Sequence, residues 1–431
     1  MISRLEIRLR SNLIDAEGAG VQRKAKDYFG IGVDEIRVIR ILTIDADLPP
    51  EQMEAARTRI FTNPVTEESS FKPLAQEFDW LIWVGYRPGV RDTAGSTAVE
   101  AIEDLFKIKF KADEAVYTSK LYEIKGSLQE SQVKIMAREI LANEIVQQWK
   151  VFSRQGWNAE NGIGFILPKV ILNHEPQVTT VPIGSDRELR EISRVRNLAL
   201  QDKDIPTIRE YFLRQDILTE RKKMGLSLPT DVELEYISQS RSDHCNHNTF
   251  RGLFRYKDLS DGRLQIVDNL FKTCIEAPTL KVKDEKPWVV SVLWDNAGVA
   301  KFNAEHNYVI TGETHNSPSN MEAYGGSLTG IVGIYRDPMG TGKGAKLILG
   351  TYGFCVGPRD YAKELKPHLH PRRLLDGVIE GVKDGGNKSG IPTPYGLLYF
   401  DESYMGKCLV FVTALGIMPA LLGKEPSHVK K

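Results

Sequence analysis

The sequence predicts an α+β protein that consists of a duplicated front unit, a helical linker and a C-terminal α+β domain. Its 431 residues are too many for one ordinary domain and favour about two to four domains. An internal repeat occupies the front of the chain. A strongly charged helical segment separates this repeat from a Gly-rich segment with strand and turn signals.

The repeat is clearest in two four-residue motifs that begin with Asp and end with Gly, called Asp–Gly motifs below. "DAEG" at residues 15–18 resembles "DTAG" at residues 92–95, a shift of 77, and Asn63 lies over Asn143 at a shift of 80. Each copy is expected to form a ferredoxin-like α/β unit with a strand, a turn, a helix, two strands and a helix. Since one such unit has a single apolar sheet face, we expect the two copies to pack face to face and bury both faces.

We place the two copies at residues 1–79 and 80–152. The opening strands are expected at "RLEIRLR" and "WLIWVGYR", the later strands at "IRVIRILTI" and "EAVYTSKLYEI", and the closing helices near Pro50 and Gln129. Two unrelated α+β units of similar make-up are the alternative to a duplication. Neither copy contains a pattern typical of catalysis, so we interpret this front part as a scaffold or a docking surface.

A linker domain is expected at residues 153–229. It starts with a loop-rich stretch and becomes helical and strongly charged from Ser185 to Leu226. The charges indicate a solvated helix face. Four apolar residues of this segment are expected to pack inside it: Leu198, Leu200, Ile208 and Phe212.

The charge balance argues against an electrostatic grip on nucleic acid or anionic lipid, because 57 basic residues are matched by 57 acidic ones. The N-terminus has no unbroken apolar run, and we find no signal peptide and no stretch of about 18 apolar residues. Four scattered cysteines form neither a disulfide framework nor a CxxC pair: Cys245, Cys274, Cys355 and Cys408. We therefore expect a cytoplasmic protein without a membrane or nucleic-acid partner.

A capping box at Thr230 and Glu233 predicts the start of a helix that ends near Ser240. The stretch "SDHCNH" that follows is too crowded for a structural zinc tetrahedron, and no second ligand pair follows it. A cysteine nucleophile would need its own base and orienting group, and nothing distinguishes Cys245 from an ordinary buried thiol. Taken alone, this stretch does not decide between a metal site, a nucleophile and part of a larger site.

The segment from Tyr308 to Lys346 contains many residues of types that bind ligands or take part in catalysis. We expect a short strand at residues 308–310, a turn at Gly325–Gly326, a strand at "GIVGIYRD" and a Gly-rich loop at residues 340–344. Small residues let backbone amides approach phosphate oxygens, so Gly340, Gly342 and Lys343 are candidates for nucleotide binding. The loop is not a Walker A motif, because Asp337 stands where the first Gly belongs.

Side chains in the same segment suit a metal–phosphate site. Glu313 and Asp337, each at an expected strand end, suit Mg²⁺, which takes few carboxylates together with phosphate oxygens. Arg336 can fork onto a phosphate, and His315 can act as an acid or base near neutral pH. The alternative is a turn-rich β domain whose polar residues are merely at the surface.

Three stretches of the second half resemble the phosphoribosylformylglycinamidine synthase family and, more broadly, the aminoimidazole-ribonucleotide synthetase superfamily. They are "VELEYISQSRSDHCNH", "GETHNSPSNMEAYGGSLTGIVGIYRD" and "DGGNKSGIPTPYGLLYFDESYMGKCLV". The front repeat is similar to the family's small accessory subunit, which its long-chain form carries as a fused, duplicated domain. The resemblance implies an aminoimidazole-ribonucleotide synthetase-like N-terminal α+β domain at residues 230–431.

The family is a ligase of de novo purine biosynthesis. It converts formylglycinamide ribonucleotide, ATP and glutamine into the amidine, ADP, phosphate and glutamate. The resemblance implies that His244 is the active-site histidine, that His247 contacts the nucleotide and that His315 is a proton acceptor. The other implied roles are substrate contact for Thr314, Asn316 and Arg336, and Mg²⁺ binding for Glu313 and Asp337.

The chain departs from the family pattern at several of these places. Asp243 replaces a Glu, and Ser317 replaces a second His. Lysines expected near the nucleotide are replaced by Asn248, Trp294 and Thr311, and the cations that could compensate are Lys301, Lys343 and Lys346. These losses weaken the ATP assignment more than the fold assignment.

In the family, a domain that completes the nucleotide cleft follows the synthetase-like N-terminal domain. We therefore expect the chain to act as a portion or subunit of the synthase, with the remaining domains and a glutaminase that supplies ammonia as partners. It is open whether the domain self-pairs as a homodimer through an exposed sheet or pairs with a missing half. Two alternatives for the function remain: a non-catalytic assembly or nucleotide-binding subunit, and another ATP-dependent superfamily member, such as a selenophosphate or thiamine-phosphate enzyme.

Overall fold

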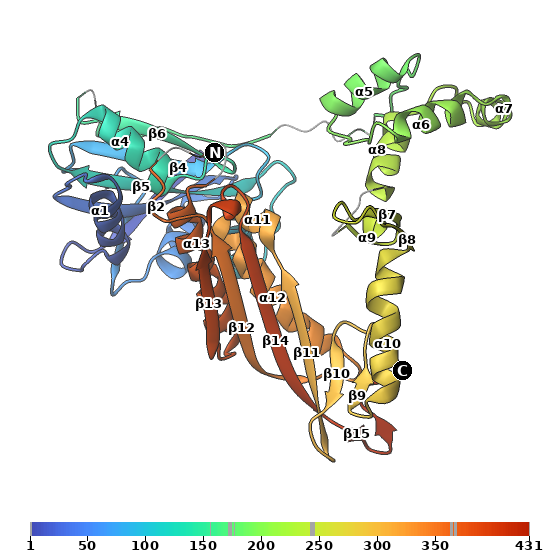
Figure 1. The fold of residues 1–431 in the computed structure, drawn as a ribbon. Coiled ribbons are helices and arrows are strands. Elements are labelled where there is room, and N and C mark those ends of the chain that lie inside the picture. The colour runs from blue at the N-terminus through green and yellow to red at the C-terminus, as the bar shows by residue number, and fades with distance from the viewer. Residues whose placement is uncertain are drawn as a thin grey trace. The chain divides into compact units, whose positions relative to one another are not determined.

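The computed structural model describes residues 2–155, 157–170, 175, 177–241, 246–362, 365 and 369–430 (Figure 1). The chain divides into two compact units, one with residues 1–170 and 288–431 and the other with residues 171–287. The first unit contains a front domain and a C-terminal domain, and each unit is described by itself below. None of the helices in the described part of the chain has the length and apolar composition that a bilayer span requires.

The front domain is built on one six-stranded sheet with the order β3-β1-β2-β5-β4-β6. Each copy of the repeat forms strand, helix, strand, helix, strand. Copy 1 consists of β1 (Ile2–Leu9), α1 (Ala16–Phe29), β2 (Glu35–Asp45), α2 (Pro50–Ala56), which runs on as η1 (Arg57–Phe61), and β3 (Glu67–Ser70). Copy 2 consists of β4 (Trp80–Tyr86), α3 (Thr93–Phe106), β5 (Ala115–Lys125), α4 (Glu130–Met136), which runs on as η2 (Ala137–Leu141), and β6 (Gln147–Ser153).

The two copies join edge to edge, so the expected face-to-face packing was wrong. Strands β2 and β5 pair antiparallel along their whole length, from Glu35 opposite Lys125 to Asp45 opposite Ala115. The expected pair of strands before the closing helix was also wrong, because each long central strand is single and the last strand follows the helix. A shared sheet lets both copies place their helices on one face, which buries both apolar surfaces in a single layer.

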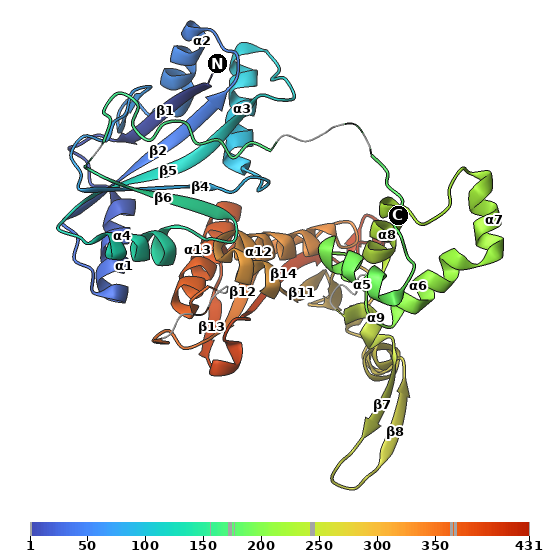
Figure 2. The same ribbon diagram turned by 90° about the horizontal axis from the view of Figure 1, so that it is seen from above.

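Two apolar clusters lie under the helices. Figure 2 shows α1 and α4 at one end of the sheet and α2 and α3 at the other. Strand β2 contributes side chains from one face to both clusters. Ile36 and Val38 belong to the α1–α4 cluster, and Leu42 and Ile44 belong to the α2–α3 cluster. The opposite face of the sheet is covered by two loop segments, around residues 74–78 and 157–166. Each copy therefore needs a helix from the other to complete its core.

The repeated Asp–Gly motif has a physical explanation. Asp15 caps α1 by accepting a hydrogen bond from the Gly18 amide (2.9 Å), and its second oxygen accepts one from the Val38 amide of β2 (2.7 Å). Helix and strand come so close that a Cβ on Gly18 would lie 2.0 Å from the Ile36 carbonyl oxygen. Copy 2 repeats these contacts with Asp92, Gly95, Thr118 and Val116. The motif therefore joins the first helix of each copy to its long strand.

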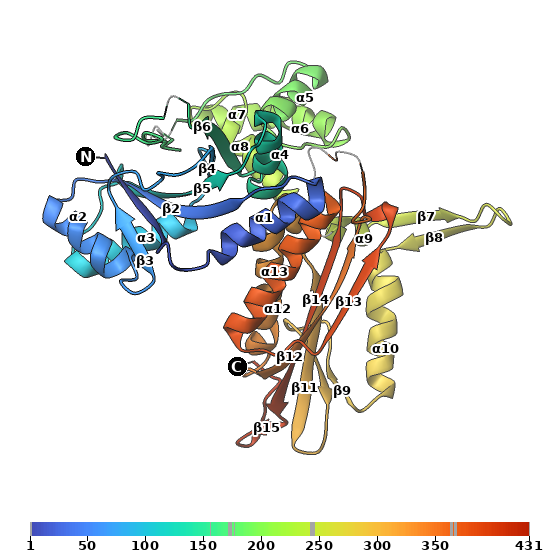
Figure 3. The same cartoon turned by 90° about the vertical axis from the view of Figure 1, so that its left-hand side faces the viewer.

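The C-terminal domain has a second six-stranded sheet with the order β13-β12-β14-β11-β10-β9, antiparallel except between β12 and β13. Its strands are β9 (Val289–Ser291), β10 (Gly298–Lys301), β11 (His306–Thr314), β12 (Lys346–Val356), β13 (Tyr395–Phe400) and β14 (Leu409–Pro419). Its helices are α11 (Asn316–Met321), α12 (Ala323–Gly340), α13 (Pro371–Ser389) and the short η5 (Glu402–Tyr404), and two short strands follow at β15 (Leu421–Leu422) and β16 (Glu425–Pro426). Figure 3 shows α12 and α13 together on one side of this sheet.

The expected strand at residues 330–337 was wrong, because this stretch lies inside α12. The predicted turn at Gly325–Gly326 was wrong as well, since both glycines are in the first turn of that helix. Glu322 caps the helix by accepting a hydrogen bond from the Gly325 amide. The buried positions recur at helical spacing: Ala323, Gly326, Ser327, Gly330, Ile331, Ile334, Tyr335 and Pro338.

Helix α13 packs unusually close to α12 because it carries a stripe of glycines. A Cβ on Gly377, Gly381 or Gly385 would lie within 2.2–2.7 Å of the side chains of α12 that face it. The core below contains side chains from both helices and from β12 and β14, including the buried thiol of Cys408. The four-residue spacing of the glycines places them on one helix face.

The second unit contains the linker helices. They are α5 (Asp186–Val195), α6 (Asp204–Leu213), α7 (Gln215–Lys223) and α8 (Asp231–Ser240). The expected packing of this segment is confirmed: Leu198, Ile208 and Phe212 are buried, and Leu200 packs against them. The expected capping box is confirmed, because Thr230 and Glu233 exchange side-chain and backbone hydrogen bonds, and α8 ends at Ser240.

The rest of the second unit is a short helix, a hairpin and a longer helix. They are α9 (His247–Phe250), β7 (Leu253–Lys257), β8 (Leu264–Asp268), and η4 (Lys272–Glu276), which continues into α10 (Ala277–Glu285). Figure 2 shows β7 and β8 as a two-stranded ribbon beside α9.

Replacing Gly18 by Ala is expected to lower the free energy of unfolding of the front domain by about 1–3 kcal/mol, because the new methyl group would overlap the Ile36 carbonyl. Gly20 in the same helix is the matched control, since a Cβ there meets no atom within 4 Å. Gly20→Ala should raise stability by up to about 1 kcal/mol through helix propensity. Amide exchange in β2 of the whole chain measures both changes, and equal effects of the two substitutions would contradict the close contact.

Cys408 gives the C-terminal domain a predictable pH dependence. Burial raises the pKa of its thiol from the ordinary value of 9.0 to about 11. The unfolded chain therefore ionises first, and the free energy of unfolding should fall as the pH rises from 9.0 towards about 11. The difference in stability between the wild type and Cys408→Ala, measured by denaturation across this window, should shrink accordingly. A constant difference would contradict the raised pKa.

Candidate functional site

The site residues expected on one segment lie where β11 passes into α11. Glu313 and Thr314 are the last residues of β11, His315 precedes α11, and Asn316 begins it. The His315 amide donates a hydrogen bond to the Val410 carbonyl oxygen (2.8 Å), and the Asn316 side-chain oxygen accepts one from the Val410 amide (2.8 Å). The segment therefore stays attached to β14 beyond the end of the regular pairing, which fixes its backbone.

The imidazole of His315 is held against α12. A Cβ on Gly330 would lie 2.8 Å from the His315 Cβ, so only a glycine lets the helix pass at this distance. The His315 Nδ1 atom is buried and has no hydrogen-bond partner in the part of the chain that the structure describes. A buried ring nitrogen without a partner is costly in a folded protein and points to a missing partner, such as a ligand or an ordered water.

Glu313 and Asp337 are close enough to influence each other. Strand alternation places Glu313 on the same face of β11 as the buried Val309, and Asp337 lies in the last turn of α12. Burial raises the pKa of Asp337, the negative charge of Glu313 raises it further, and Arg336 lowers it. A cation between the two carboxylates would relieve this repulsion.

Arg336 lowers the pKa of Asp337, but no cation among the described residues forms an ion pair with either acid. Within the described residues, the carboxylate of neither Glu313 nor Asp337 forms an ion pair or accepts a hydrogen bond. No group of three or more His, Cys, Asp or Glu side chains suited to a metal occurs there either. Two carboxylates fit Mg²⁺, because this ion keeps water and takes phosphate oxygens as its other ligands.

Arg336 and Thr314 are exposed near the pair. Arg336 follows Tyr335 on α12 and directly precedes Asp337. Thr314 lies opposite Phe411 at the end of β11. The structure thus brings together five of the expected residues on β11, α11 and α12 and adds Asp337 through the helix that was predicted as a strand.

The Gly-rich loop after α12 is held by other parts of the domain. The Gly342 amide donates to Asp295 (2.8 Å), and the Lys343 amide donates to the Ser427 carbonyl oxygen (2.8 Å). The Lys343 ammonium group is 2.8 Å from Glu425. Gly342 has a positive φ of 57°, and a Cβ there would meet the Ser427 carbonyl at 2.3 Å. These glycines therefore have a packing reason of their own.

Two expected site residues belong to the stretch around "SDHCNH". His244 lies outside the described residues, as do Asp243 and Cys245. His247 is the first residue of α9 in the second unit, and its side chain is exposed.

Sequence reasoning missed a contact between the front domain and α13. Tyr28 of α1 donates a hydrogen bond to Asp376 (2.6 Å), and the guanidinium of Arg372 stacks over the Tyr28 ring at 4.5 Å. Burial and the hydrogen bond to Asp376 raise the pKa of Tyr28 to about 12. Arg373 donates to the Arg138 carbonyl oxygen (2.8 Å). The signal in the sequence was the pair of arginines in the first turn of a helix, where the helix dipole disfavours cations.

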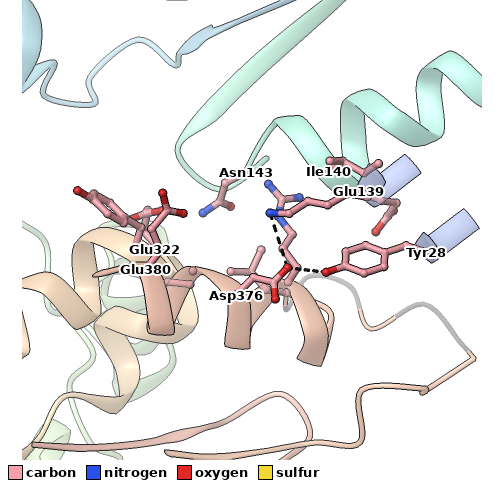
Figure 4. A pocket seen from close by; sticks show the side chains of 13 residues that line it. Tyr28, Glu139, Ile140, Asn143, Glu322, Asp376 and Glu380 are labelled. Carbon is pink, nitrogen blue, oxygen red and sulfur yellow. Dashed lines mark hydrogen bonds and ion pairs between the residues drawn. The ribbon is translucent and has the colours of Figure 1, made fainter. Parts of the chain in front are cut away.

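A pocket of about 130 Å³ lies between these two domains of the first unit. Figure 4 shows Tyr28, Glu139 and Asn143 on the front-domain side and Glu322, Asp376 and Glu380 on the other. Burial lowers the pKa of Arg373 at this pocket, while Glu139 and Glu322 act in the opposite direction. The contact thus mixes charges of both signs around a small cavity.

Three family models match the chain in succession. Residues 80–154 match the model described as phosphoribosylformylglycinamidine (FGAM) synthase. Residues 189–248 match the formylglycinamide ribonucleotide amidotransferase linker domain, and residues 294–418 match the AIR synthase related protein, N-terminal domain. The three matched segments follow one another along the second repeat copy, the linker and the C-terminal domain.

Curated relatives agree with these models. The PurL subunit of phosphoribosylformylglycinamidine synthase from Picrophilus torridus is 32% identical over 233 residues, which are 54% of this chain and 26% of that protein. The subunit from Thermoplasma acidophilum is 31% identical over 235 residues, with the same shares. The chain therefore spans about a quarter of the length of the curated relatives that it matches.

A solved structure of T. maritima PurL complexed with ADP is similar over 47% of this chain and 26% of that one, with 26% identity and a TM-score of 0.29. T. maritima PurL complexed with FGAR is similar over 49% and 26%, with 27% identity and a TM-score of 0.28. The models and the curated relatives agree with the predicted resemblance. Over residues 80–154, 189–248 and 294–418 the chain is thus similar to domains of the phosphoribosylformylglycinamidine synthase family and of the AIR synthase related proteins.

Proposed function

We propose that the chain takes part in the ATP-dependent conversion of formylglycinamide ribonucleotide to formylglycinamidine ribonucleotide, as a portion or subunit of the synthase ligase. The PurL relatives carry the name of this enzyme. The observation that supports the proposal most directly is that Glu313 and Asp337 influence each other where β11 ends against α12, while His315, two residues after Glu313, packs against Gly330 of the same helix. A carboxylate pair and a histidine beside an exposed arginine are suited to phosphoryl transfer.

Mg²⁺ would be held by Glu313 and Asp337. Bound there together with ATP, the cation would neutralise negative charge on the phosphates. Arg336 would add a second positive charge, since its exposed guanidinium can take two phosphate oxygens at once. The strand and the helix fix the backbone positions of the two residues, so the packing of α12 on β11 determines how close their carboxylates can come.

His315 would accept a proton at its imidazole ring. Its backbone is fixed by Val410 and its ring by Gly330, so the proton acceptor is positioned before a ligand arrives. Thr314 and Asn316 would contact the substrate. The Asn316 oxygen is engaged by the Val410 amide, which leaves its amide nitrogen for this contact.

The remaining assignments stay proposals with less structural support. His244 would be the second catalytic histidine, and His247 would contact the nucleotide. Gly340, Gly342 and Lys343 would also lie near the nucleotide, although the amides of Gly342 and Lys343 already donate to groups within the domain. The nucleotide would therefore be held mainly by metal and charge and less by this loop.

The partners would be the remaining synthase domains and a glutaminase that supplies ammonia. The C-terminal sheet carries exposed apolar side chains, among them Ile310, Leu397, Tyr399 and Phe411. Such a surface supports pairing with a second sheet, either in a homodimer or with another synthase domain.

A non-catalytic nucleotide-binding subunit is the second candidate. The replacement of expected lysines by Asn248, Trp294 and Thr311 favours it, as does the engaged loop at Gly342. Such a subunit would bind Mg²⁺–ADP without binding formylglycinamide ribonucleotide. Titrating the two ligands separately into the chain distinguishes the candidates.

Glu313→Gln and Asp337→Asn are each expected to weaken Mg²⁺–ADP binding at least about tenfold, because each removes one of two charged metal ligands. Isothermal titration calorimetry of the whole chain measures the affinity. Glu305→Gln is the matched control, since Glu305 is an exposed acid just before the other end of β11 and should leave the affinity unchanged. Wild-type affinity in both site variants would refute the metal assignment.

The repulsion between Glu313 and Asp337 should also be measurable as a raised pKa of Asp337. Without metal, its pKa lies above the ordinary value of 3.8, and Glu313→Gln should lower it because one raising charge is gone. Mg²⁺ should lower it in the wild type, so metal binding weakens as the pH falls through the raised pKa. Carboxyl ¹³C NMR of Asp337 follows both effects. A pKa that responds to neither change would show that the two acids are independent.

A further inference from the structure

The duplication in the front domain supplies an internal comparison for one residue, Asn143. It lies two residues after the end of the second copy's closing helix and corresponds to Asn63 in the first copy. Both asparagines make the same turn. The Asn63 carbonyl oxygen accepts a hydrogen bond from the Glu67 amide (2.9 Å), and the Asn63 amide donates one to the Glu67 carboxylate (2.9 Å). Asn143 does the same with Gln147, at 2.7 and 2.9 Å.

The side-chain oxygens also match. Asn63 Oδ1 accepts a hydrogen bond from the Val65 amide (2.9 Å), and Asn143 Oδ1 accepts one from the Ile145 amide (3.2 Å). The turn therefore explains the oxygen and the backbone of both residues. It leaves the side-chain nitrogen of each without a role.

Only the second copy uses this nitrogen. Asn143 Nδ2 donates a 2.6 Å hydrogen bond to the Met321 carbonyl oxygen in the C-terminal domain. Asn143 is 6% exposed, whereas Asn63 is exposed. The Asn63 nitrogen donates to no group among the residues that the structure describes. One copy thus has a contact that its duplicate lacks, although their local structure is the same.

Met321 lies at the junction of two helices: it is the last residue of α11, and the next residue, Glu322, caps α12. Helix α11 starts directly after His315, and α12 carries Arg336 and Asp337. The bond from Asn143 therefore holds the junction between the two helices that carry the site. The Arg373 bond to the Arg138 carbonyl oxygen (2.8 Å) attaches the same part of the front domain to α13.

We propose that Asn143 is a positioning residue through which the second repeat copy fixes the α11–α12 junction and, with it, the geometry of His315. This role does not depend on which ligand the site binds. The first copy does not have the same surface at this place. Arg59 stands where the second copy has Glu139, which lines the pocket between the front domain and the C-terminal domain. The duplication thus produced one turn that serves the front domain alone and one that also serves the site.

The test compares Asn143→Asp with Asn63→Asp in the whole chain. Each aspartate keeps the oxygen that accepts the turn hydrogen bond and loses the nitrogen donor. Asn143→Asp should speed hydrogen exchange of residues 316–325 about three- to tenfold, as expected for the loss of one buried hydrogen bond. It should also shift the imidazole NMR signals of His315. Asn63→Asp should change neither.

Exchange in β2 and β5 reports whether the front domain stays folded in each variant. If Asn143→Asp unfolds it, Asn143→Ser replaces that variant, because the shorter side chain still accepts in the turn but does not reach Met321. Unchanged exchange at residues 316–325 and unchanged His315 signals in the folded variant would overturn the proposal. Equal changes in the Asn63 variant would overturn it too, since they would come from the turn alone.

Discussion

The candidate site depends on how closely α12 approaches the end of β11. Gly330 has no side chain, so the helix can pass over His315 at a distance that any Cβ would forbid. The same approach brings Asp337 near Glu313, and burial together with this neighbour raises the pKa of Asp337. A helix held further away would separate the two acids and leave the histidine in solvent.

Glycines of α13 extend this close packing to another side of α12. Gly377, Gly381 and Gly385 let α13 lie against α12 with almost no space between them, so the two helices form one closely packed layer. The front domain contacts that layer at both ends of the pocket, through Tyr28 on Asp376 and through Asn143 on Met321. A domain without catalytic residues can thereby influence the shape of a site in another domain.

The sequence predicted most elements of the front domain and the linker, because strands with alternating polarity and the capping box at Thr230 are local signals. It failed where the outcome depends on contacts distant in the sequence. The edge-to-edge pairing of β2 with β5 depends on register, which polarity alone does not reveal.

The same limit applies to the site. The stretch at residues 330–337 is rich in β-branched and glycine residues, and only its fit against β11 and α13 makes it helical. The acid pair was predicted from residue type, yet its members meet through a strand and a helix and not through two strands. The loop at residues 340–344 looked like a phosphate cradle because glycine content does not show that Asp295 and Ser427 already take its amides. Apart from the place of Asn143 in the repeat, nothing in the sequence predicted its hydrogen bond to Met321.

The central claim is that the carboxylates of Glu313 and Asp337 bind one divalent cation beside a nucleotide. Crystals of the whole chain soaked with Mn²⁺ and ADP test it directly through the anomalous signal of manganese. We expect a manganese peak between the two carboxylates, at a position that also contacts the ADP phosphates. Bound ADP with its manganese elsewhere, and these two acids without a metal, would contradict it.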